Sequence, residues 1–440
     1  MDSIQELYQF FERNHFAYST DSRKISPNDV FFCLTGEKFD ANVFAEDAKQ
    51  QGAGIVVTNR EDLRTAEGFF FSENPLHSFQ QLAKIHALKM DAKIVIIGGS
   101  NGKTTTKELV HSVLSKFGST HTTAGNFNNH VGVPITLLGI RPNHEYAVVE
   151  MGTNHPGEMK ILCDLVYPEI GIITNIGKEH LEGFGDIEAV AKEESEVFLK
   201  LIECSGTGVV NLDDSWISSM SIRLNKSIGI SIDRSIVVSG KAKFSPEIIR
   251  EMPKLIMKFQ GPNLINGERE FSIAGSYNAY NILFALAIGD YFGFDLETCL
   301  NEMQTYSPKN NRSEWREIGT TKVFLDAYNA NPSSMNAAIR SFHTLEGEKS
   351  YFIGDMLELG SHSELEHQQI LNLIQELGIA DSSYLVGNEF YRYCSQFPMR
   401  FSDTESLLAW LDTHPVKSDY VFVKGSRGIK MENVLDHFKS

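Results

Sequence analysis

Short apolar runs alternate along the chain with longer segments in which apolar residues recur at helical spacing. The short runs are predicted strands, because Val, Ile and Phe dominate them and turn residues bound them. In chain order they cover 30–34, 54–58, 93–97, 146–150, 170–174, 208–212, 323–326, 350–354, 384–386 and 420–424. Predicted helices lie between many of them, so the pattern indicates an α/β protein with largely parallel sheets.

The same pattern divides the chain into three parts. Residues 1–90 are predicted to form a small α/β domain, with an opening helix to about Asn14 and another at 42–51. Residues 91–306 form a central domain, in which 213–274 breaks into short β-like pieces that suggest an antiparallel insertion. Residues 307–440 form a doubly wound domain, whose helices are predicted at 333–345, after Ser361 and after Gly428.

The stretch KIVIIGGSNGKTTTK, residues 93–107, predicts a strand, a tight glycine loop and the start of a helix. Such a loop can bind phosphate, because its backbone N–H groups and the helix N-terminus favour an anion. Lys103 could reach the β- and γ-phosphates of ATP, and Thr104 could bind Mg²⁺. The general Walker pattern has a glycine where Ile97 stands, so a chance match is an alternative for the loop taken alone.

Composition and charge narrow the class of protein. The apolar share of 42% and the charged share of 22% are those of a soluble globular protein. The chain has no apolar run long enough to cross a membrane and no signal-peptide pattern at its start, so we expect a cytoplasmic protein without membrane insertion. A net charge of −17 argues against nucleic acid as a partner. The five cysteines lack ligand spacing, which predicts buried thiols rather than disulfides or zinc.

Polar residues stand where two central strands end. Glu150 closes a buried strand, and His180 follows another in the turn TNIGKEH. Ligands of open parallel sheets bind at the carboxyl ends of strands, so we expect the glycine loop, Glu150 and His180 at one edge. Glu150 is a candidate metal ligand. His180 could be a second ligand or orient a catalytic group, although a structural histidine is the alternative.

Two other stretches are rich in amides. Asn126, Asn128 and Asn129 lie in a glycine-flanked turn that could hydrogen-bond a polar ligand or be merely solvated. Asn278 and Asn281 stand three apart at a predicted helix start, which suits capping or contact with a nucleotide.

The third domain offers charged and aromatic candidates. Arg312 presents a positive fork for phosphate, Asp326 a carboxylate for ribose hydroxyls and Tyr328 a stacking face. Lys424 and Arg427 could hold a substrate carboxylate, with ordinary surface charges as the alternative.

Taken together, these stretches resemble a known family, the ATP-dependent Mur ligases of peptidoglycan synthesis. The resemblance covers nearly the whole chain, in the order DSRKI, FDAN, GSNGKTTTKEL, GNFNNHVGVPITLL, VVEMGTNHPGEM, TNIGKEHLEGFG, NRSEW, DAYNANPSSM, IGDMLELG and KGSRG. The family's loop has the shorter GxxGKT form, which accounts for Ile97.

The resemblance implies three domains: one for a UDP moiety, a central P-loop ATPase domain and a C-terminal Rossmann-like domain. It implies a monomer that uses ATP and Mg²⁺ to join D-Ala-D-Ala to UDP-MurNAc-tripeptide, because GNFNN and YNANP favour the dipeptide-adding type. The implied reaction phosphorylates the tripeptide carboxylate, and the dipeptide amine then attacks the acyl phosphate. Two anions meet in the first step, so Mg²⁺ and Lys103 must neutralise charge.

The resemblance also implies roles for individual residues. Lys103, Glu150 and His180 match catalytic positions, and Thr104, Glu150 and His180 match metal positions. The implied ATP site consists of Gly99, Ser100, Asn101, Gly102, Lys103, Thr104, Thr105, Asn278, Asn281, Arg312, Asp326 and Tyr328. The implied substrate contacts are Ser22, Arg23, Asn126, Asn128, Asn129, Asn329, Asn331, Asp355, Lys424, Ser426 and Arg427.

The chain departs from the family at one position. The family usually has a lysine on the helix after HLEGFG, carbamylated so that its new carboxylate binds a second Mg²⁺. In AVAKEESEVF, Glu194 falls at that position and Lys192 on an earlier lysine. We hypothesise that Glu194 supplies this oxygen ligand permanently. The alternative is that Glu193, Glu194 and Glu196 form a solvated acidic helix face.

Other functions fit part of the same pattern. A related amide ligase, adding a single amino acid or glutamate to a folate, would share the ATP site. A small-molecule kinase would share only the loop and would not need the third domain. A non-enzymatic Mur-like binding protein is a further alternative, although Lys103, Thr104, Glu150 and His180 argue against it.

Overall fold

The computed structural model describes residues 3–36, 38–233, 242–260 and 266–438. The chain forms two compact units. Unit 1 comprises Met1–Ile96, Gly118–Thr153 and Glu158–Glu169, and unit 2 comprises Ile97–Phe117, Asn154–Gly157 and Ile170–Ser440. The division falls inside strand β7 (Lys93–Gly98), so each unit contains part of that strand.

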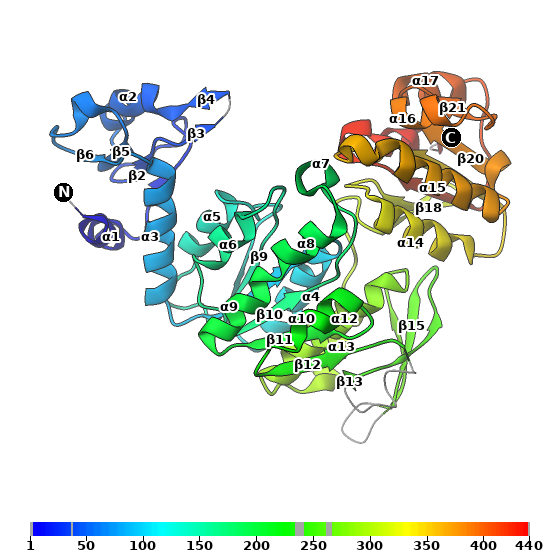
Figure 1. Cartoon of the computed structure of the whole chain (residues 1–440), viewed down its shortest axis with the longest axis horizontal. Coiled ribbons are helices and arrows are strands. Elements are labelled where there is room, and N and C mark those ends of the chain that lie inside the picture. The colour runs from blue at the N-terminus through cyan, green and yellow to red at the C-terminus, as the bar shows by residue number, and fades with distance from the viewer. Residues whose placement is uncertain (1–2, 37, 234–241, 261–265, 439–440) are drawn as a thin grey trace. The chain divides into compact units, whose positions relative to one another are not determined.

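Unit 1 starts with a parallel sheet in the order β1 (Tyr18–Ser19), β2 (Val30–Phe32), β5 (Ile55–Thr58) and β6 (Phe69–Phe71). Alternate residues of β2 serve opposite faces: Phe31 joins the cluster that holds Val56, whereas the Phe32 ring lies 4.9 Å from that of Phe79. Both faces are therefore covered, as parallel sheets require. The accompanying elements are α1 (Ile4–Arg13), β3 (Thr35–Gly36), β4 (Phe39–Asp40), η1 (Ala41–Phe44), α2 (Ala45–Gln50), η2 (Glu61–Leu63) and the long α3 (Pro75–Lys89), drawn in blue in Figure 1.

The remainder of unit 1 extends from β7, with strands in the order β7, β9 (Tyr146–Glu150) and β8 (Thr120–Thr122). All five residues of β9 are buried, and the strand ends on the carboxylate of Glu150. Helices α5 (Gly132–Leu138) and α6 (Glu158–Cys163) complete this part.

Unit 2 contains the other strands that extend from β7, in the order β13 (Ala242–Phe244), β12 (Ser227–Ile230), β11 (Thr207–Asn211), β10 (Ile170–Ile173) and β7. The pairs from β10 to β13 are parallel. Their helices are α4 (Lys103–Phe117), α7 (Leu181–Phe184), α8 (Ile187–Glu194), α9 (Glu196–Cys204), α10 (Ser215–Ser221), α12 (Tyr277–Tyr291) and α13 (Leu296–Thr305). Helix α12 packs against α4, which follows the glycine loop (Figure 1).

The antiparallel insertion expected over 213–274 is confirmed only in its second half, where β14 (Glu247–Arg250), β15 (Leu255–Phe259) and β16 (Gly267–Phe271) pair antiparallel. In the first half the expectation was wrong, because α10 is a helix and β12 and β13 are parallel strands. Residues 234–241 and 261–265 of the segment for which it was predicted lie outside the described residues.

The C-terminal part of unit 2 is a mixed sheet in the order β17 (Glu314–Ile318), β18 (Thr321–Asp326), β22 (Tyr420–Lys424), β19 (Lys349–Gly354), β20 (Ser383–Val386) and β21 (Arg400–Phe401). Only β17 among them pairs antiparallel, with β18. Phe324 and Phe422 pack with α14 (Pro332–His343) and α15 (Ser363–Glu376), whereas their neighbours Val323 and Val423 pack with α17 (Thr404–Leu411). The period of two thus buries both faces and gives the predicted doubly wound arrangement.

The predicted fold class, α/β with largely parallel sheets, is confirmed. The closing helix predicted after Gly428 is confirmed as the 3-10 helix η6 (Met431–Phe438), which follows the short 3-10 helix η5 (Arg427–Ile429). Residues three apart share a face in a 3-10 helix, which buries Met431 and Val434 together on the sheet. Four of the five cysteines are buried free thiols, and Cys204 is half-buried. Within the described ranges, no helix is long and apolar enough to cross a bilayer.

Candidate active site

The glycine loop has the backbone geometry that its sequence predicted. Strand β7 ends at Gly98 and α4 begins at Lys103, with Gly99 and Gly102 at φ of +110° and +81°. These angles favour glycine. A Cβ on Gly99 would lie 2.3 Å from Thr174 Oγ1, so the residue after β10 also leaves no room for a side chain there. Thr104 is buried and Thr105 half-buried on the first turn of α4.

The turn after β10 holds this loop in place. Ser100 N donates to the carbonyl of Asn175 at 2.9 Å, and Asn175 Nδ2 donates to Asn101 O at 2.8 Å. Gly177 N in turn donates to Ser100 Oγ at 2.8 Å. Two segments 74 to 77 residues apart in the sequence are therefore joined by hydrogen bonds at the glycine loop in unit 2.

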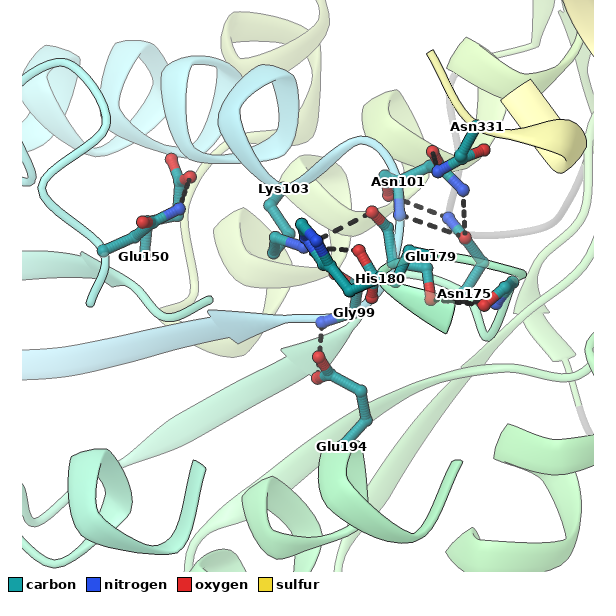
Figure 2. A network of polar contacts seen from close by, with 12 residues as sticks. Gly99, Asn101, Lys103, Glu150, Asn175, Glu179, His180, Glu194 and Asn331 are labelled. Carbon is teal, nitrogen blue, oxygen red and sulfur yellow. Dashed lines mark hydrogen bonds and ion pairs between the residues drawn. The ribbon is translucent and has the colours of Figure 1, made fainter. Parts of the chain in front are cut away.

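The ammonium group of Lys103 lies inside the loop, against a carboxylate. Lys103 Nζ donates to Gly99 O and lies 3.4 Å from Glu179 Oε2, and both side chains are largely buried (Figure 2). Glu179 was not predicted from the sequence. Its only signal was its place beside His180 in the turn TNIGKEH.

Glu194 also contacts the loop, from the C-terminal end of α8. Its Oε2 accepts a hydrogen bond from Gly99 N at 2.6 Å, and the residue is 2% exposed (Figure 2). Burial raises the pKa of Glu194 to about 8. The charge of Lys103 lowers this pKa, and the charge of Glu179 raises it. Glu193 is buried too, and accepts from Gly157 N at 2.7 Å. The alternative of a solvated acidic face is therefore wrong for both residues.

In unit 1, Glu150 and the amide-rich turn come together. Glu150 is 1% exposed, and its Oε1 accepts from Asn128 Nδ2 at 2.9 Å. Asn129 has a local role, since its Oδ1 accepts from Gly132 N at the start of α5. Asn126 is exposed on the same turn. Among these three asparagines, Asn128 is the one whose side chain hydrogen-bonds to another candidate within the described residues.

His180 is held by the C-terminal domain. Its Nδ1 lies 2.6 Å from Glu358 Oε2, and Glu182 N donates to Glu358 O at 3.2 Å. The hydrogen bond with His180 lowers the pKa of Glu358. Two residues earlier than His180, Lys178 Nζ lies 2.6 Å from the buried Glu366. Neither Glu358 nor Glu366 had a sequence signal beyond its place in or after IGDMLELG.

Asn278 and Asn281 are buried in the first turns of α12 rather than capping it. Asn278 Nδ2 donates to Ala274 O at 2.6 Å, and Asn281 Nδ2 donates to Asn278 Oδ1 at 2.7 Å. Asn281 Oδ1 accepts from Thr106 Oγ1 at 3.0 Å. The capping alternative is wrong, since Ser276 is the N-cap and has no side-chain cap bond. The pair instead ties α12 to the helix that follows the glycine loop.

The candidates of the third domain gather at the carboxyl ends of its strands. The Arg312 guanidinium lies 3.5 Å from the centroid of the Tyr328 ring, and that of Arg427 lies 5.4 Å from it. Lys424 is 2% exposed and pairs with Asp326 at 2.5 Å, so it is not an ordinary surface charge. Arg427 is exposed.

Asn331 links this edge to the glycine loop, whereas Asn329 contacts Lys424 of the same edge. Asn331 caps α14 by accepting from Ser334 N, and its Nδ2 donates to Asn101 Oδ1 at 2.8 Å (Figure 2). Asn329 is exposed, and its carbonyl accepts from Lys424 at 3.3 Å. The structure therefore brings together candidates from the second and third predicted domains within unit 2.

Asp355 and Ser426 have structural contacts. Asp355 is 2% exposed, and its two oxygens accept from Glu389 N and Phe390 N at 2.8 and 2.9 Å, at the start of α16 (Asn388–Tyr393). Burial raises the pKa of Asp355. Ser426 N donates to Asp355 O at 3.0 Å, and Ser426 Oγ accepts from Leu357 N at 2.9 Å. These bonds fasten the loop that carries Glu358.

Ser22 and Arg23 lie in unit 1, between β1 and β2. The Arg23 side chain is 84% exposed and pairs with Asp21 at 2.8 Å. This pair lies within one turn of the chain, so it fixes no other candidate.

The described residues contain no group of three or more His, Cys, Asp or Glu side chains that could by themselves hold a metal ion. They do offer hard oxygen donors beside the loop, in the Thr104 hydroxyl and the Glu194 carboxylate. Mg²⁺ typically takes one or two carboxylates and completes its shell with water and substrate phosphates. The donor set of unit 2 thus fits a cation that arrives with a nucleotide.

Three family models match successive parts of the chain: the Mur ligase family catalytic domain at residues 17–94, the Mur ligase middle domain at 97–289, and the Mur ligase glutamate ligase domain at 311–427. The UDP-N-acetylmuramoyl-tripeptide--D-alanyl-D-alanine ligase of Escherichia coli (strain K12) is 31% identical over 431 residues, which cover 95% of this chain and 92% of that protein. The ligase of the same name from Bacillus subtilis (strain 168) is 29% identical over 429 residues, covering 95% and 92%.

A crystal structure of MurF from Acinetobacter baumannii superimposes with a TM-score of 0.88 at 26% identity, over 100% of this chain and 99% of that one. The three-domain expectation for the fold is therefore confirmed. On sequence, order of domains and fold alike, the chain belongs to the Mur ligase family.

Proposed function

We propose that this protein joins D-Ala-D-Ala to UDP-MurNAc-tripeptide at the expense of ATP, and so completes the UDP-MurNAc-pentapeptide precursor of peptidoglycan. The observation that carries the proposal is similarity over more than nine-tenths of both chains to ligases named for that reaction. The glycine loop, with Lys103 buried inside it, supplies the chemistry that an ATP-dependent ligase needs.

The reaction proceeds by two transfers at one carboxylate. The tripeptide carboxylate attacks the γ-phosphorus of ATP and displaces ADP, which gives an acyl phosphate. The dipeptide amine then attacks the acyl carbon, loses a proton and displaces phosphate, which leaves a new amide bond. The first transfer brings two anions together, so the positive charge of Lys103 lowers its barrier.

Mg²⁺ is the proposed metal. Thr104, Glu150, His180 and Glu194 are its proposed ligands in this chain, and the bound ion would neutralise phosphate charge. The hydroxyl and carboxylates are donors of the kind Mg²⁺ prefers, and the buried, acid-rich surroundings of Glu194 favour a cation.

Glu194 is proposed to replace a carbamylated lysine as a permanent oxygen ligand. Its burial against Gly99 N supports this, since the carboxylate already lies at the phosphate loop. We expect Glu194→Ala to weaken Mg²⁺ dependence and activity, and added bicarbonate to leave wild-type activity unchanged. Normal activity and Mg²⁺ dependence in Glu194→Ala would contradict the role.

We also propose roles for the other candidate residues one by one. Gly99, Ser100, Asn101, Gly102 and Thr105 would cradle phosphates through the loop. Nucleoside contacts are proposed for Asn278, Asn281, Arg312, Asp326 and Tyr328, and substrate contacts for Ser22, Arg23, Asn126, Asn128, Asn129, Asn329, Asn331, Asp355, Lys424, Ser426 and Arg427. Asn278, Asn281 and Asp355 are buried and hydrogen-bonded within the protein.

Domain boundaries near residues 90 and 306 are also proposed. The family models match 17–94, 97–289 and 311–427, and the gaps between these matches fall near both positions. We further propose that the protein is a monomer and that it acts in the cytoplasm.

Phosphate release from ATP by purified protein tests the function. The protein is supplied with Mg²⁺ and UDP-MurNAc-tripeptide, with and without D-Ala-D-Ala, and the product is weighed by mass spectrometry. Release that requires both substrates and yields the pentapeptide is the expected result.

The same assay separates the alternatives. Turnover with a single amino acid in place of D-Ala-D-Ala would keep the ATP chemistry and overturn the acceptor. A lack of turnover with every substrate would favour a non-enzymatic binding protein.

A further inference from the structure

His180 and Glu358 form a contact between two segments that are far apart in the sequence. His180 lies in the turn after β10, at φ of +45°, and Glu358 lies in the loop after β19, at φ of +63°. Their side chains meet at 2.6 Å, Nδ1 to Oε2. Two non-glycine residues in left-handed backbone conformations face each other here, and such conformations persist only where the surrounding structure holds them.

The contact fixes the chemical state of the imidazole ring. A carboxylate only accepts hydrogen bonds, so Nδ1 must carry the proton that it donates to Glu358. In the neutral ring Nε2 is then the unprotonated nitrogen, whose lone pair can accept a hydrogen bond or bind a cation. Without Glu358 the ring could adopt either tautomer and rotate.

Surrounding bonds hold Glu358 in position. Glu182 N donates to Glu358 O at 3.2 Å, Leu357 N donates to Ser426 Oγ at 2.9 Å, and Met356 N donates to the buried His367 Nε2 at 3.2 Å. The carboxylate is therefore carried by a fastened loop, although its side chain is 58% exposed.

His180 is also adjacent to the residue that contacts the phosphate-loop lysine. Glu179 Oε2 lies 3.4 Å from Lys103 Nζ, as Figure 2 shows with His180 close by. A change in the orientation of His180 would thus occur next to the reacting phosphates.

We propose that Glu358 is a positioning residue for the ligase function proposed above: a carboxylate from the C-terminal domain orients His180 and selects the tautomer with a bare Nε2. His180 becomes correctly oriented only when the loop after β19 lies against the turn after β10. Catalysis is thereby linked to the docking of the domain that carries the loop.

A second pair joins the same two parts of the chain and supplies a matched control. Lys178 Nζ lies 2.6 Å from Glu366 Oε1, two residues before His180 and eight after Glu358. Glu366→Gln weakens this junction without touching the imidazole. A general loosening of the junction would therefore affect both variants, whereas loss of positioning would affect only one.

Glu358→Asn and Glu358→Gln test the proposal. Asparagine tolerates the left-handed backbone but is too short to reach His180, whereas the glutamine amide oxygen can still accept from Nδ1. We expect kcat of Glu358→Asn to fall by about 10- to 100-fold, as when the carboxylate partner of a functional histidine is removed. KM for ATP should stay within about two-fold, because the binding contacts remain. Glu358→Gln should recover most of kcat, and Glu366→Gln should resemble the wild type.

The second readout is independent of activity. Imidazole ¹⁵N shifts of histidine-labelled protein report the tautomer, with His180 assigned by the signal missing from His180→Gln. We expect protonated Nδ1 in the wild type, Glu358→Gln and Glu366→Gln, and a mixture in Glu358→Asn. An unchanged tautomer in Glu358→Asn, or an equal loss of kcat in Glu358→Asn and Glu366→Gln, would overturn the proposal. Wild-type protein without ligase activity would overturn the proposed function instead, and the tautomer would still report on Glu358.

Discussion

At the scale of single residues, the buried charged side chains determine the chemistry of the site. Two acidic residues lie near Lys103: Glu179 contacts it, and the buried Glu194 of α8 accepts a hydrogen bond from Gly99 N of the same loop. Lys103 and Glu179 are stable here as a pair, because each charge alone would be costly to bury, and burial raises the pKa of Glu194 to about 8.

We expect Asp355 to contribute more to stability than to substrate binding. Asp355→Ala leaves the N–H groups of Glu389 and Phe390 without their acceptors, and we expect the free energy of unfolding to fall by about 2 kcal/mol. Asp355→Asn keeps one acceptor oxygen and should lose less. Urea unfolding followed by tryptophan fluorescence, to which Trp315 and Trp410 of the same domain contribute, measures the loss. A raised KM for the tripeptide substrate without loss of stability would show that Asp355 binds substrate instead.

Because of His86, the stability of unit 1 depends on pH. Its ring is fully buried, Nε2 donates to Ile140 O at 2.8 Å and Nδ1 accepts from Tyr8 at 3.2 Å. Burial lowers the pKa of His86 to about 4. The charge of Arg141 also lowers this pKa, whereas the hydrogen bond to Ile140 raises it. The unfolded chain therefore binds the proton first as pH falls, so stability is complete above pH 6.5 and is lost as pH drops towards 4.

We expect this one group to reduce the stability of unit 1 by about 2 kcal/mol between pH 7 and pH 5. Hydrogen exchange of α3 peptides, corrected for intrinsic rates, measures the local free energy at each pH. His86→Gln cannot titrate, so its pH dependence should be flatter by that amount. Equal slopes in wild type and variant would contradict the prediction.

At the scale of elements, the phosphate loop depends on a neighbour that its own sequence does not specify. The strand, loop and helix follow from residues 93–107, but the space around Gly99 is set by Thr174, at the end of β10. Ser100 and Asn101 are likewise held by the turn after β10. The loop is thus preorganised by a second strand end, which lowers the cost of binding phosphate.

Gly99→Ala tests this dependence. The new Cβ would meet Thr174 Oγ1 at 2.3 Å and its backbone N at 2.6 Å, so the loop must move and nucleotide affinity should fall by at least about ten-fold. Gly378→Ala is the matched control, because Gly378 also has a positive φ of +67° but open space around its Cβ position. Its cost should be limited to about 1 kcal/mol of stability. Isothermal titration with a non-hydrolysable ATP analogue measures both, and equal affinities would show that the contact with Thr174 is unimportant.

At the scale of the whole molecule, a chain built of two compact units with several separate cores is not expected to unfold in one step. Ligands stabilise the part of a protein that binds them. The phosphate loop and the candidate nucleoside contacts all belong to unit 2.

Calorimetry should therefore show more than one transition, and a non-hydrolysable ATP analogue with Mg²⁺ should raise the transition of unit 2. At 100 times its Kd the analogue contributes about 2.7 kcal/mol. EDTA should remove most of this shift if the cation enters with the nucleotide, and Lys103→Met should also reduce it. Lys116→Met, an exposed position on the same helix, should not. A shift that survives in Lys103→Met would place the nucleotide elsewhere.

Local pattern alone determined much of this protein. The strands at 146–150 and 420–424 were predicted at their observed ends, and the glycine loop was identified from consecutive residues. These features depend on the period of two, on turn residues and on backbone geometry, which neighbouring residues fix. The ordered series of motifs also indicated the family, because its members share those local requirements.

Tertiary structure alone decided which charges meet. Glu179 at Lys103, Glu194 at Gly99 and Glu358 at His180 are contacts between residues separated by 76, 95 and 178 positions. The sequence left Glu194 open between a buried ligand and a solvated face, because a run of glutamates on a helix has no period that reveals what covers it. Burial depends on the packing of distant segments, and so do the chemical roles of these carboxylates.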